Sequence, residues 1–202
     1  MSAVREESRE RYELVVIGIS AGGLVALCEL FRLLRPDFPI AIAVVQHRSR
    51  NSTALASVLQ DCTRLQVCDV EDKMPISPGA VHLAPPDYHT LVDDGFFSLS
   101  LDAPVTYSRP SIDVLFESAA DQFGPKLVGI VMTGANRDGA RGLRRIADAG
   151  GRAIVQDPAT AEVPVMPAAA IALVPEAVVL PISGIAAHLG SLATPLQRGG
   201  VP

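Results

Sequence analysis

Val15-Val16-Ile17-Gly18-Ile19-Ser20-Ala21-Gly22-Gly23 is an apolar, strand-like run that ends at a serine among glycines. A segment with helical periodicity follows at once. The pattern therefore predicts a buried strand, a tight turn and a helix. Within it, Gly18-x-Ser20-x-Gly22 matches the strand-to-helix turn on which some hydrolases present a nucleophilic serine to solvent. We therefore take Ser20 as a candidate nucleophile.

Two nucleotide-binding interpretations of the same turn fit less well. A dinucleotide-binding turn reads Gly-x-Gly-x-x-Gly, and Ser20 stands where its middle glycine is required. A P-loop needs a lysine after its closing glycine, and this chain has Leu24 there. The next predicted strand ends in Gln46-His47 and offers no acidic residue for a ribose. We expect no dinucleotide and no other cofactor.

Composition limits the class of protein. A chain of 202 residues with 49% hydrophobic residues is long enough for one domain with a sizeable core. No apolar run approaches the ~18 residues of a membrane span. The net charge of −5, without a long basic cluster, argues against nucleic acid and anionic membranes as partners. The N-terminus is mixed in charge and is not a secretory signal. We expect a cytoplasmic domain at residues 13–193 between disordered tails at 1–12 and 194–202.

The cysteines and histidines show no metal-binding pattern. No Cys-x-x-Cys, His-x-x-x-His or mixed cluster has ligand spacing, so we expect no metal. The three cysteines, Cys28, Cys62 and Cys68, cannot all pair with one another. Cys28 lies on the apolar face of the first predicted helix. We therefore expect reduced thiols in the core.

Strand-like and helix-like patterns alternate along the chain. The alternation predicts an α/β fold: a three-layer, doubly wound, mostly parallel sheet with helices on both faces. Asp93-Asp94-Gly95 marks a β-hairpin appended to it. The predicted strands are Leu14–Ile19, Ile40–Val45, Leu65–Val67, Ala80–Leu83, Leu127–Met132, Ala153–Gln156 and Ala177–Leu180, with hairpin strands at Thr90–Val92 and Phe96–Leu101. The predicted helices are Leu24–Leu34, Ser52–Gln60, Val114–Phe123, Ala140–Ala149, Met166–Leu173 and Ser183–Leu192.

Three polar residues follow three of the predicted strands. Ser20 ends the first strand, His47 follows the second long apolar strand, and Asp138 lies in the glycine-bracketed loop after Leu127–Met132. Sites in open α/β sheets form beyond the carboxyl ends of the strands. A serine hydroxyl becomes a nucleophile when an imidazole accepts its proton and a carboxylate orients that imidazole. The three positions therefore predict a Ser-His-Asp triad.

Each of these residues has a plainer interpretation. Ser20 could cap the first helix, His47 could make one backbone contact, and Asp138 could cap the helix at Ala140–Ala149. Taken one at a time, the plain interpretation is favoured for His47 and Asp138. The coincidence of all three at strand ends favours the triad.

The other histidines are weaker candidates. His82 lies within a predicted strand and His89 beside the hairpin, so we expect both to be structural. His188, on the last predicted helix, would give the chain order Ser…Asp…His of α/β-hydrolases. In that fold, however, the nucleophile follows several strands, and Ser20 follows the first.

Several motifs together resemble those of the chemotaxis protein-glutamate methylesterases, in their catalytic domain. The resemblance extends in order from Val15 to about Leu192. Its motifs are Ile17–Gly23, Val45-Gln46-His47, Ala84–His89, Ser108–Phe116, Thr133-Gly134-x-x-x-Asp138-Gly139-Ala140-x-Gly142, and Gln156-Asp157 through Met166-Pro167.

The resemblance implies a three-layer α/β enzyme that hydrolyses glutamate γ-methyl esters on chemoreceptors. Such enzymes often deamidate receptor glutamines as well, and they use no cofactor. It assigns Ser20 as nucleophile, His47 as base and Asp138 as the orienting carboxylate. It also places Met166 in the substrate pocket.

Two motifs depart from the family's usual pattern. Ala21 replaces a threonine, and Gly134-Ala135-Asn136 replaces Gly-Met-Gly. An oxyanion hole can still be formed by backbone N–H groups, such as those of Ala21 and Ala135. The changes leave open an alternative, a catalytically weakened homologue that acts as a binding module in a signalling complex.

Regulation is a further expectation from the resemblance. The family's common architecture has an N-terminal phosphoacceptor domain, and the twelve residues of the predicted N-terminal tail are too few to form one. We expect control, where there is any, to come from a separate regulator protein, and the substrate to be a methyl-accepting chemoreceptor or related protein.

Overall fold

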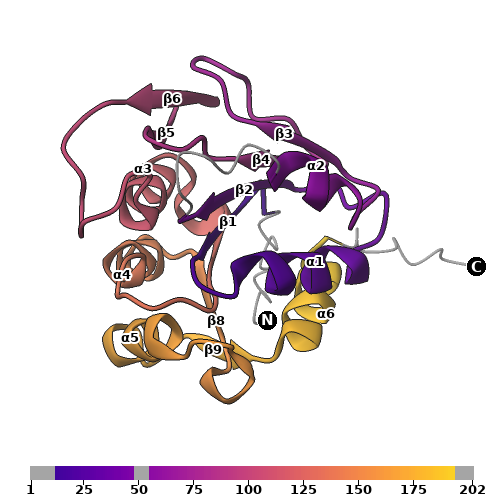
Figure 1. Cartoon of the computed structure of the whole chain (residues 1–202), viewed down its shortest axis with the longest axis vertical. Coiled ribbons are helices and arrows are strands. Elements are labelled where there is room, and N and C mark those ends of the chain that lie inside the picture. The colour runs from indigo at the N-terminus through magenta and orange to yellow at the C-terminus, as the bar shows by residue number, and fades with distance from the viewer. Residues whose placement is uncertain (1–11, 48–54, 194–202) are drawn as a thin grey trace, which may run out of the picture.

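The protein forms a seven-stranded parallel sheet with helices on both faces and a separate two-stranded hairpin (Figure 1). The structure is a computed structural model that describes residues 12–47 and 55–193. The sheet has the strand order β3-β4-β2-β1-β7-β8-β9. These strands are β1 (Leu14–Ile19), β2 (Ala41–Gln46), β3 (Gln66–Asp69), β4 (Ala80–Leu83), β7 (Leu127–Val131), β8 (Arg152–Gln156) and β9 (Val178–Leu180). The predicted fold class is confirmed.

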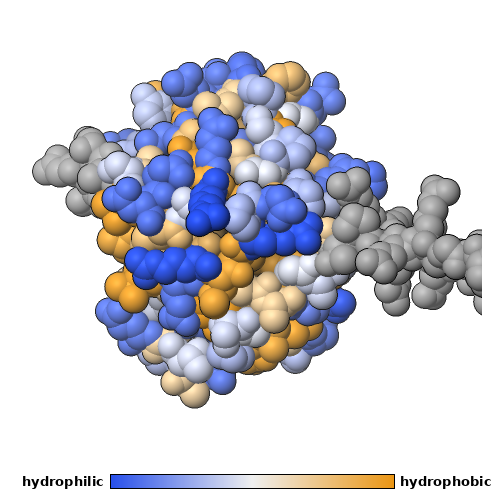
Figure 2. Space-filling model, turned by 90° about the vertical axis from the view of Figure 1, so that its right-hand side faces the viewer, coloured by the Kyte–Doolittle hydropathy of each residue, from blue (hydrophilic) through white to orange (hydrophobic). Residues whose placement is uncertain are grey.

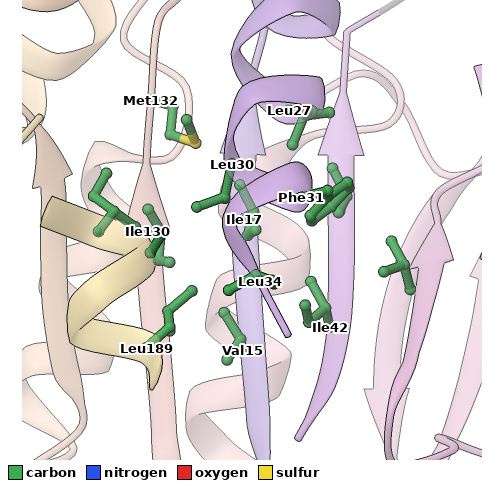
Figure 3. Close-up of a cluster of buried hydrophobic side chains, with 14 of the residues drawn as sticks. Val15, Ile17, Leu27, Leu30, Phe31, Leu34, Ile42, Ile130, Met132 and Leu189 are labelled. Carbon is green, nitrogen blue, oxygen red and sulfur yellow. The ribbon is translucent and has the colours of Figure 1, made fainter. Parts of the chain in front are cut away.

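Two apolar layers enclose the sheet, because successive side chains of a strand point to opposite faces. On β1, Val15, Ile17 and Ile19 join one buried cluster, and Leu14 and Val16 join the other. Figure 3 shows part of the first cluster, in which Leu27, Leu30 and Phe31 of α1 lie against the sheet. That layer contains α1 (Gly23–Leu33), α2 (Leu55–Gln60) and α6 (Ile182–Leu192). The opposite layer contains α3 (Ile112–Phe123), α4 (Ala140–Asp148) and α5 (Val165–Leu173).

The hairpin strands β5 (His89–Asp93) and β6 (Phe96–Ser100) pair antiparallel, as the Asp-Asp-Gly turn predicted. The hairpin packs against α3 and contributes Val92 and Phe97 to the second cluster. Two short 3₁₀ turns, Gly124–Lys126 and Pro158–Thr160, complete the described structure. On the face of the molecule that Figure 2 presents, hydrophilic and hydrophobic side chains are interspersed.

Most predicted elements differ from the observed ones by one or two residues at their ends. The helix predicted from Val114 begins at Ile112, and the one predicted from Leu24 begins at Gly23. The start of the helix predicted at Ser52–Gln60 and the predicted tails lie outside the described residues, apart from Tyr12. No described helix has both the length and the apolar character that crossing a bilayer requires.

The prediction of three reduced thiols is wrong. Cys28 on α1 forms a disulfide with Cys62, which follows α2, and the two Cα atoms are 5.2 Å apart. Both side chains are buried in the first cluster, where α1 packs beside α2. Periodicity placed Cys28 on the apolar face of its helix, but it carried no information about which residue that face meets. Cys68 is the free thiol of the described chain.

The central strand β1 marks the point where the chain order across the sheet reverses. β1 pairs with β2 on one side and with β7 on the other. The chain runs from β1 through β2 to the β3 edge and then returns to β7. Ligand sites in open α/β sheets lie at such a switch point, beyond the strands' carboxyl ends.

Candidate active site

Ser20 stands at the carboxyl end of β1, on a turn that close packing holds in place. Its N–H donates to the carbonyl of Thr133 at 2.9 Å, and its carbonyl accepts from the N–H of Gly23 at 2.9 Å. Gly22 has a φ of +75°, a conformation open to glycine at no steric cost. A Cβ at Gly18 would lie 2.2 Å from Ile112 Cγ2, so α3 packs directly on the strand that presents Ser20.

His47 and Asp138 are brought together from neighbouring parts of the sheet. His47 follows β2, and its N–H donates to the carbonyl of Ile19, so it lies beside the end of β1. Its Nε2 is 2.8 Å from Oδ2 of Asp138. The side chain of His47 is 14% exposed and that of Asp138 is fully buried. The structure thus brings into contact two of the three residues that the sequence predicted to form a triad.

Four hydrogen bonds satisfy the Asp138 carboxylate. Besides His47, it accepts from the Ser111 hydroxyl at 2.8 Å and from the backbone N–H groups of Ile112 and Asp113 at 2.8 and 3.1 Å. Burial alone would raise the pKa of this carboxyl. The hydrogen bonds from His47, the two backbone N–H groups and Ser111 outweigh burial and lower the pKa of Asp138 below its ordinary value. The carboxylate is therefore ionised at neutral pH.

The plainer interpretations of Ser20 and Asp138 do not describe the structure. Gly22 is the N-cap of α1, and the helix has no side-chain cap. The N-cap of α4 is Gly139, again without a side-chain cap. Asp138 instead binds the first N–H groups of α3, where a negative charge is favourable.

The hydroxyl of Ser20 forms no hydrogen bond with His47 in the part of the chain that the structure describes. Such bonds are often long in unliganded sites and tighten when a substrate binds. A Cβ built at Gly134 would lie 3.0 Å from Cβ of Ser20 and 2.6 Å from Cε of Met166. Met166, predicted to line the pocket, is therefore buried beside the loop that adjoins Ser20.

Ala21 and Ala135 lie on the two loops that flank Ser20, and both are exposed. Their N–H groups donate to no acceptor within the described residues. The carbonyl of Ala21 accepts from the Thr133 hydroxyl at 2.9 Å, which ties the first loop to the end of β7. The two N–H groups are therefore free to bind a ligand oxygen.

Two residues at the site were missed as functional candidates. Ser111 stood only within the motif Ser108–Phe116, yet its hydroxyl binds Asp138. Asn136 was recognised only as a departure from a family pattern, yet its Nδ2 lies 3.4 Å from Nδ1 of His47. A serine just before a helix is a usual N-cap, so local sequence gave no sign that its hydroxyl serves another loop.

Two of the remaining histidines, His82 and His89, are held within the fold, as expected. His82 is buried, with Nδ1 3.2 Å from the carbonyl of Ile42. His89 accepts from the N–H of Ser111 and lies 3.1 Å from the carbonyl of Ala103, so it supports the loop that carries Ser111. Among the described residues, no group of three or more His, Cys, Asp or Glu side chains could hold a metal ion.

An open groove of about 460 Å³ lies next to the site. Asp113 and Arg137 form part of its wall. Each is next in sequence to a residue that contacts the His47–Asp138 pair. The lining residues are Thr106, Asp113, Arg137, Ala140, Arg141, Ala169, Ala172 and Leu173.

The fold and the site together define a class. The chain is a doubly wound α/β protein that carries a serine, a histidine and a buried carboxylate at the ends of adjacent parallel strands, an arrangement found in serine hydrolases.

Comparison with known proteins identifies the family within that class. The sequence model of the CheB methylesterase family matches residues 15–189. This chain belongs to that family. It is 45% identical to a Leptospira interrogans protein named putative protein-glutamate methylesterase/protein-glutamine glutaminase, over 79% of this chain and 84% of the relative. It is 41% identical to the protein-glutamate methylesterase FrzG of Myxococcus xanthus, over 88% of this chain and 54% of that relative.

A solved structure agrees with this assignment. The catalytic domain of the Thermotoga maritima CheB methylesterase is 32% identical to this chain and superposes with a TM-score of 0.85. The match covers 91% of this chain and all of that domain.

Proposed function

We propose that this chain is a serine hydrolase that removes methyl groups from esterified glutamate side chains of chemoreceptor-type proteins, and that it also deamidates glutamine. The observation that carries the proposal is the 2.8 Å pair of His47 and Asp138, placed beside Ser20 at adjacent strand ends. The names of the relatives, protein-glutamate methylesterase and protein-glutamine glutaminase, supply the substrate class.

The proposed chemistry begins with Ser20. Its Oγ attacks the ester carbonyl carbon while His47 takes the hydroxyl proton. Since Nε2 faces Asp138, the accepting nitrogen is Nδ1. Asp138, ionised by its low pKa, stabilises the imidazolium that forms.

The free N–H groups of Ala21 and Ala135 are suited to bind the oxyanion of the tetrahedral intermediate. Collapse of the intermediate releases methanol, which carries away the proton held by His47. Water, deprotonated by the same imidazole, then attacks the acyl-Ser20 ester and yields the glutamate carboxylate. With glutamine as substrate, ammonia leaves in place of methanol.

The test is incubation of the purified protein with chemoreceptor membranes that carry labelled methyl esters. We expect release of labelled methanol by the wild type, and loss of that release by Ser20→Ala and by His47→Ala in proteins that stay folded. Removal of an oxyanion donor in a serine protease costs about 10²–10³-fold, so loss of the nucleophile should cost more. Near-wild-type turnover by either variant contradicts the triad. Tight binding of receptor by a wild type that releases no methanol would favour the binding-module alternative.

A further inference from the structure

We propose that Asn136 is a positioning residue: it occupies Nδ1 of His47 in the resting protein and must release it before Ser20 can use it. The inference deepens the proposed function and rests on the triad proposed there. It starts from the two contacts of one side-chain amide, which lies between the backbone of Asp138 and the ring of His47.

The orientation of the Asn136 amide is fixed by its neighbours. Its Oδ1 accepts from the N–H of Asp138 at 3.1 Å. A backbone N–H can only donate, so the amide oxygen must face it. The Nδ2 group therefore faces Nδ1 of His47, 3.4 Å away. An amide nitrogen only donates, so Nδ1 of His47 is the acceptor.

The other side of the ring gives the same tautomer. Nε2 of His47 is 2.8 Å from Asp138, whose ionised carboxylate can only accept. The ring proton therefore stays on Nε2, and Nδ1 keeps its lone pair. That lone pair is the one the proposed mechanism requires for the Ser20 proton.

Asn136 and Ser20 compete for this lone pair. A neutral imidazole has one acceptor nitrogen, and an N–H···N contact at 3.4 Å is longer than the usual 2.7–3.2 Å of a good N–H···O bond. The contact is therefore weak and exchangeable. His47 is only 14% exposed, so an Nδ1 without a hydrogen-bond partner would cost desolvation free energy. The Asn136 contact avoids that cost while Ser20 does not bind Nδ1.

The residue type at position 136 supports this role for Asn136. In the family pattern that the sequence resembles, glycine stands at this position, and a glycine has no side chain that could make the contact. The asparagine thus adds a side-chain donor beside the proposed base, His47. We expect it to keep the protein in a resting state from which substrate binding draws His47 toward Ser20.

The experiment uses the whole chain and two substitutions at Asn136. Asn136→Ser keeps an oxygen near the N–H of Asp138 but removes the donor to His47. Asn136→Asp keeps the shape and places a carboxylate beside Nδ1, which favours the protonated ring and removes the base. The rate at which a fluorophosphonate probe phosphonylates Ser20, with loss of fluoride, is measured at neutral pH. Nitrogen-15 NMR of His47, assigned with a His47→Gln protein, reports on Nδ1 directly.

In Asn136→Ser we expect the Nδ1 resonance to move downfield, because it loses a donor. We also expect phosphonylation to be about 2- to 10-fold faster, since Ser20 no longer competes with the Asn136 hydrogen bond for Nδ1. In Asn136→Asp we expect phosphonylation to be slower by about tenfold or more at neutral pH, in line with a charge-assisted bond to the ring. Ser111→Ala, which removes a hydrogen bond from the far oxygen of Asp138, is the control and should leave the Nδ1 resonance in place.

An unchanged Nδ1 resonance in Asn136→Ser would show that the contact is absent and would overturn the inference. Slower phosphonylation of a folded Asn136→Ser protein would overturn it as well, because the asparagine would then assist Ser20. Failure of the proposed function appears differently: the wild type is not labelled at Ser20, while the NMR signal still reports whether Asn136 binds the ring.

Discussion

Asp138 is held by more hydrogen bonds than any other carboxylate of the site, and each bond has a separate structural source. The imidazole comes from the end of β2, the hydroxyl from the loop before α3, and two N–H groups from the first turn of α3. A carboxylate bound in this way cannot rotate or take a proton readily. Its role toward His47 is therefore orientation and charge, and not proton transfer.

Replacing Asp138 with asparagine tests that role. In Asp138→Asn, the amide that faces Nε2 can donate, so His47 would turn to the tautomer with its proton on Nδ1. That nitrogen could then no longer accept from Ser20. The same change in a serine protease lowers turnover about 10⁴-fold, and we expect a loss of that order in methanol release. Circular dichroism serves as the control for folding; full activity in a folded Asp138→Asn protein would assign Asp138 a purely structural role.

For single residues, the sequence predicted the site residues that follow strands and missed those that approach the site only in three dimensions. Ser20, His47 and Asp138 stand at recognisable positions, because parallel strands end at the same edge of a sheet. Ser111 and Asn136 stand in loops whose paths depend on tertiary packing. Their hydroxyl and amide can be assigned to Asp138 and His47 from distances alone.

The helices α3 and α4 exchange the carboxylates that cap them. Asp138, which precedes α4, binds the first N–H groups of α3. Asp113, in the first turn of α3, accepts from the N–H groups of Gly139 and Gly142 at the start of α4, at 2.9 and 2.8 Å. A Cβ at Gly142 would lie 2.5 Å from Cβ of Phe116, so the two helices approach closely. The position of Asp138 therefore depends on the packing of the α3–α4 pair, and not on its own loop alone.

The disulfide between α1 and the end of α2 should stabilise the fold. It closes a loop with a sequence separation of 34, and loops of that size correspond to roughly 3–4 kcal/mol of unfolding free energy in the chain-entropy account. We expect the double substitution Cys28→Ala and Cys62→Ala to lower the unfolding free energy by about that amount in urea titrations. Cys68→Ala is the matched control and should have a smaller effect.

Counting thiols gives an independent check of the same element. A denatured, unreduced sample should expose one reactive thiol, from Cys68, and a reduced sample should expose three. Three thiols before reduction would contradict the disulfide.

Element boundaries and types followed well from periodicity, but the pairing of α1 with α2 depends on how helices pack on one face of the sheet. That packing has no local signature in the sequence.

Across the whole molecule, the site lies where the two apolar layers and the sheet meet the end of β1. One layer carries α1, which begins after Ser20. The other carries α4, which follows Asp138, and α3, whose first turn binds the Asp138 carboxylate. Alternating strand and helix patterns predicted the layers and the parallel sheet. They did not specify that the hairpin would pack on α3, because that contact joins elements whose side chains show no shared pattern.

The stability of the whole molecule should depend on acid through the two buried carboxyls, Asp138 and Asp113. The folded state lowers the pKa of Asp138, so its stabilising contribution is present above the unfolded pKa of about 3.9 and is lost as pH falls through the lower folded value. For Asp113, burial raises the pKa, the Gly142 N–H opposes that effect, and the nearby Asp138 charge adds to it. Its contribution is therefore present below about 3.9 and lost as pH rises through the raised folded value.

The two effects have opposite signs, and substitutions can separate them. We expect the stability advantage of the wild type over Asp138→Asn, measured by urea unfolding, to shrink as pH falls from about 6 to below 3.9. The advantage over Asp113→Asn should instead grow over the same range, because the wild-type carboxyl gains its proton more readily when folded. Urea titrations at several pH values on the three proteins provide the measurement. Parallel stability curves for the wild type and Asp138→Asn would mean that Asp138 ionises alike in the folded and unfolded chain, and that its hydrogen bonds only offset the cost of burial.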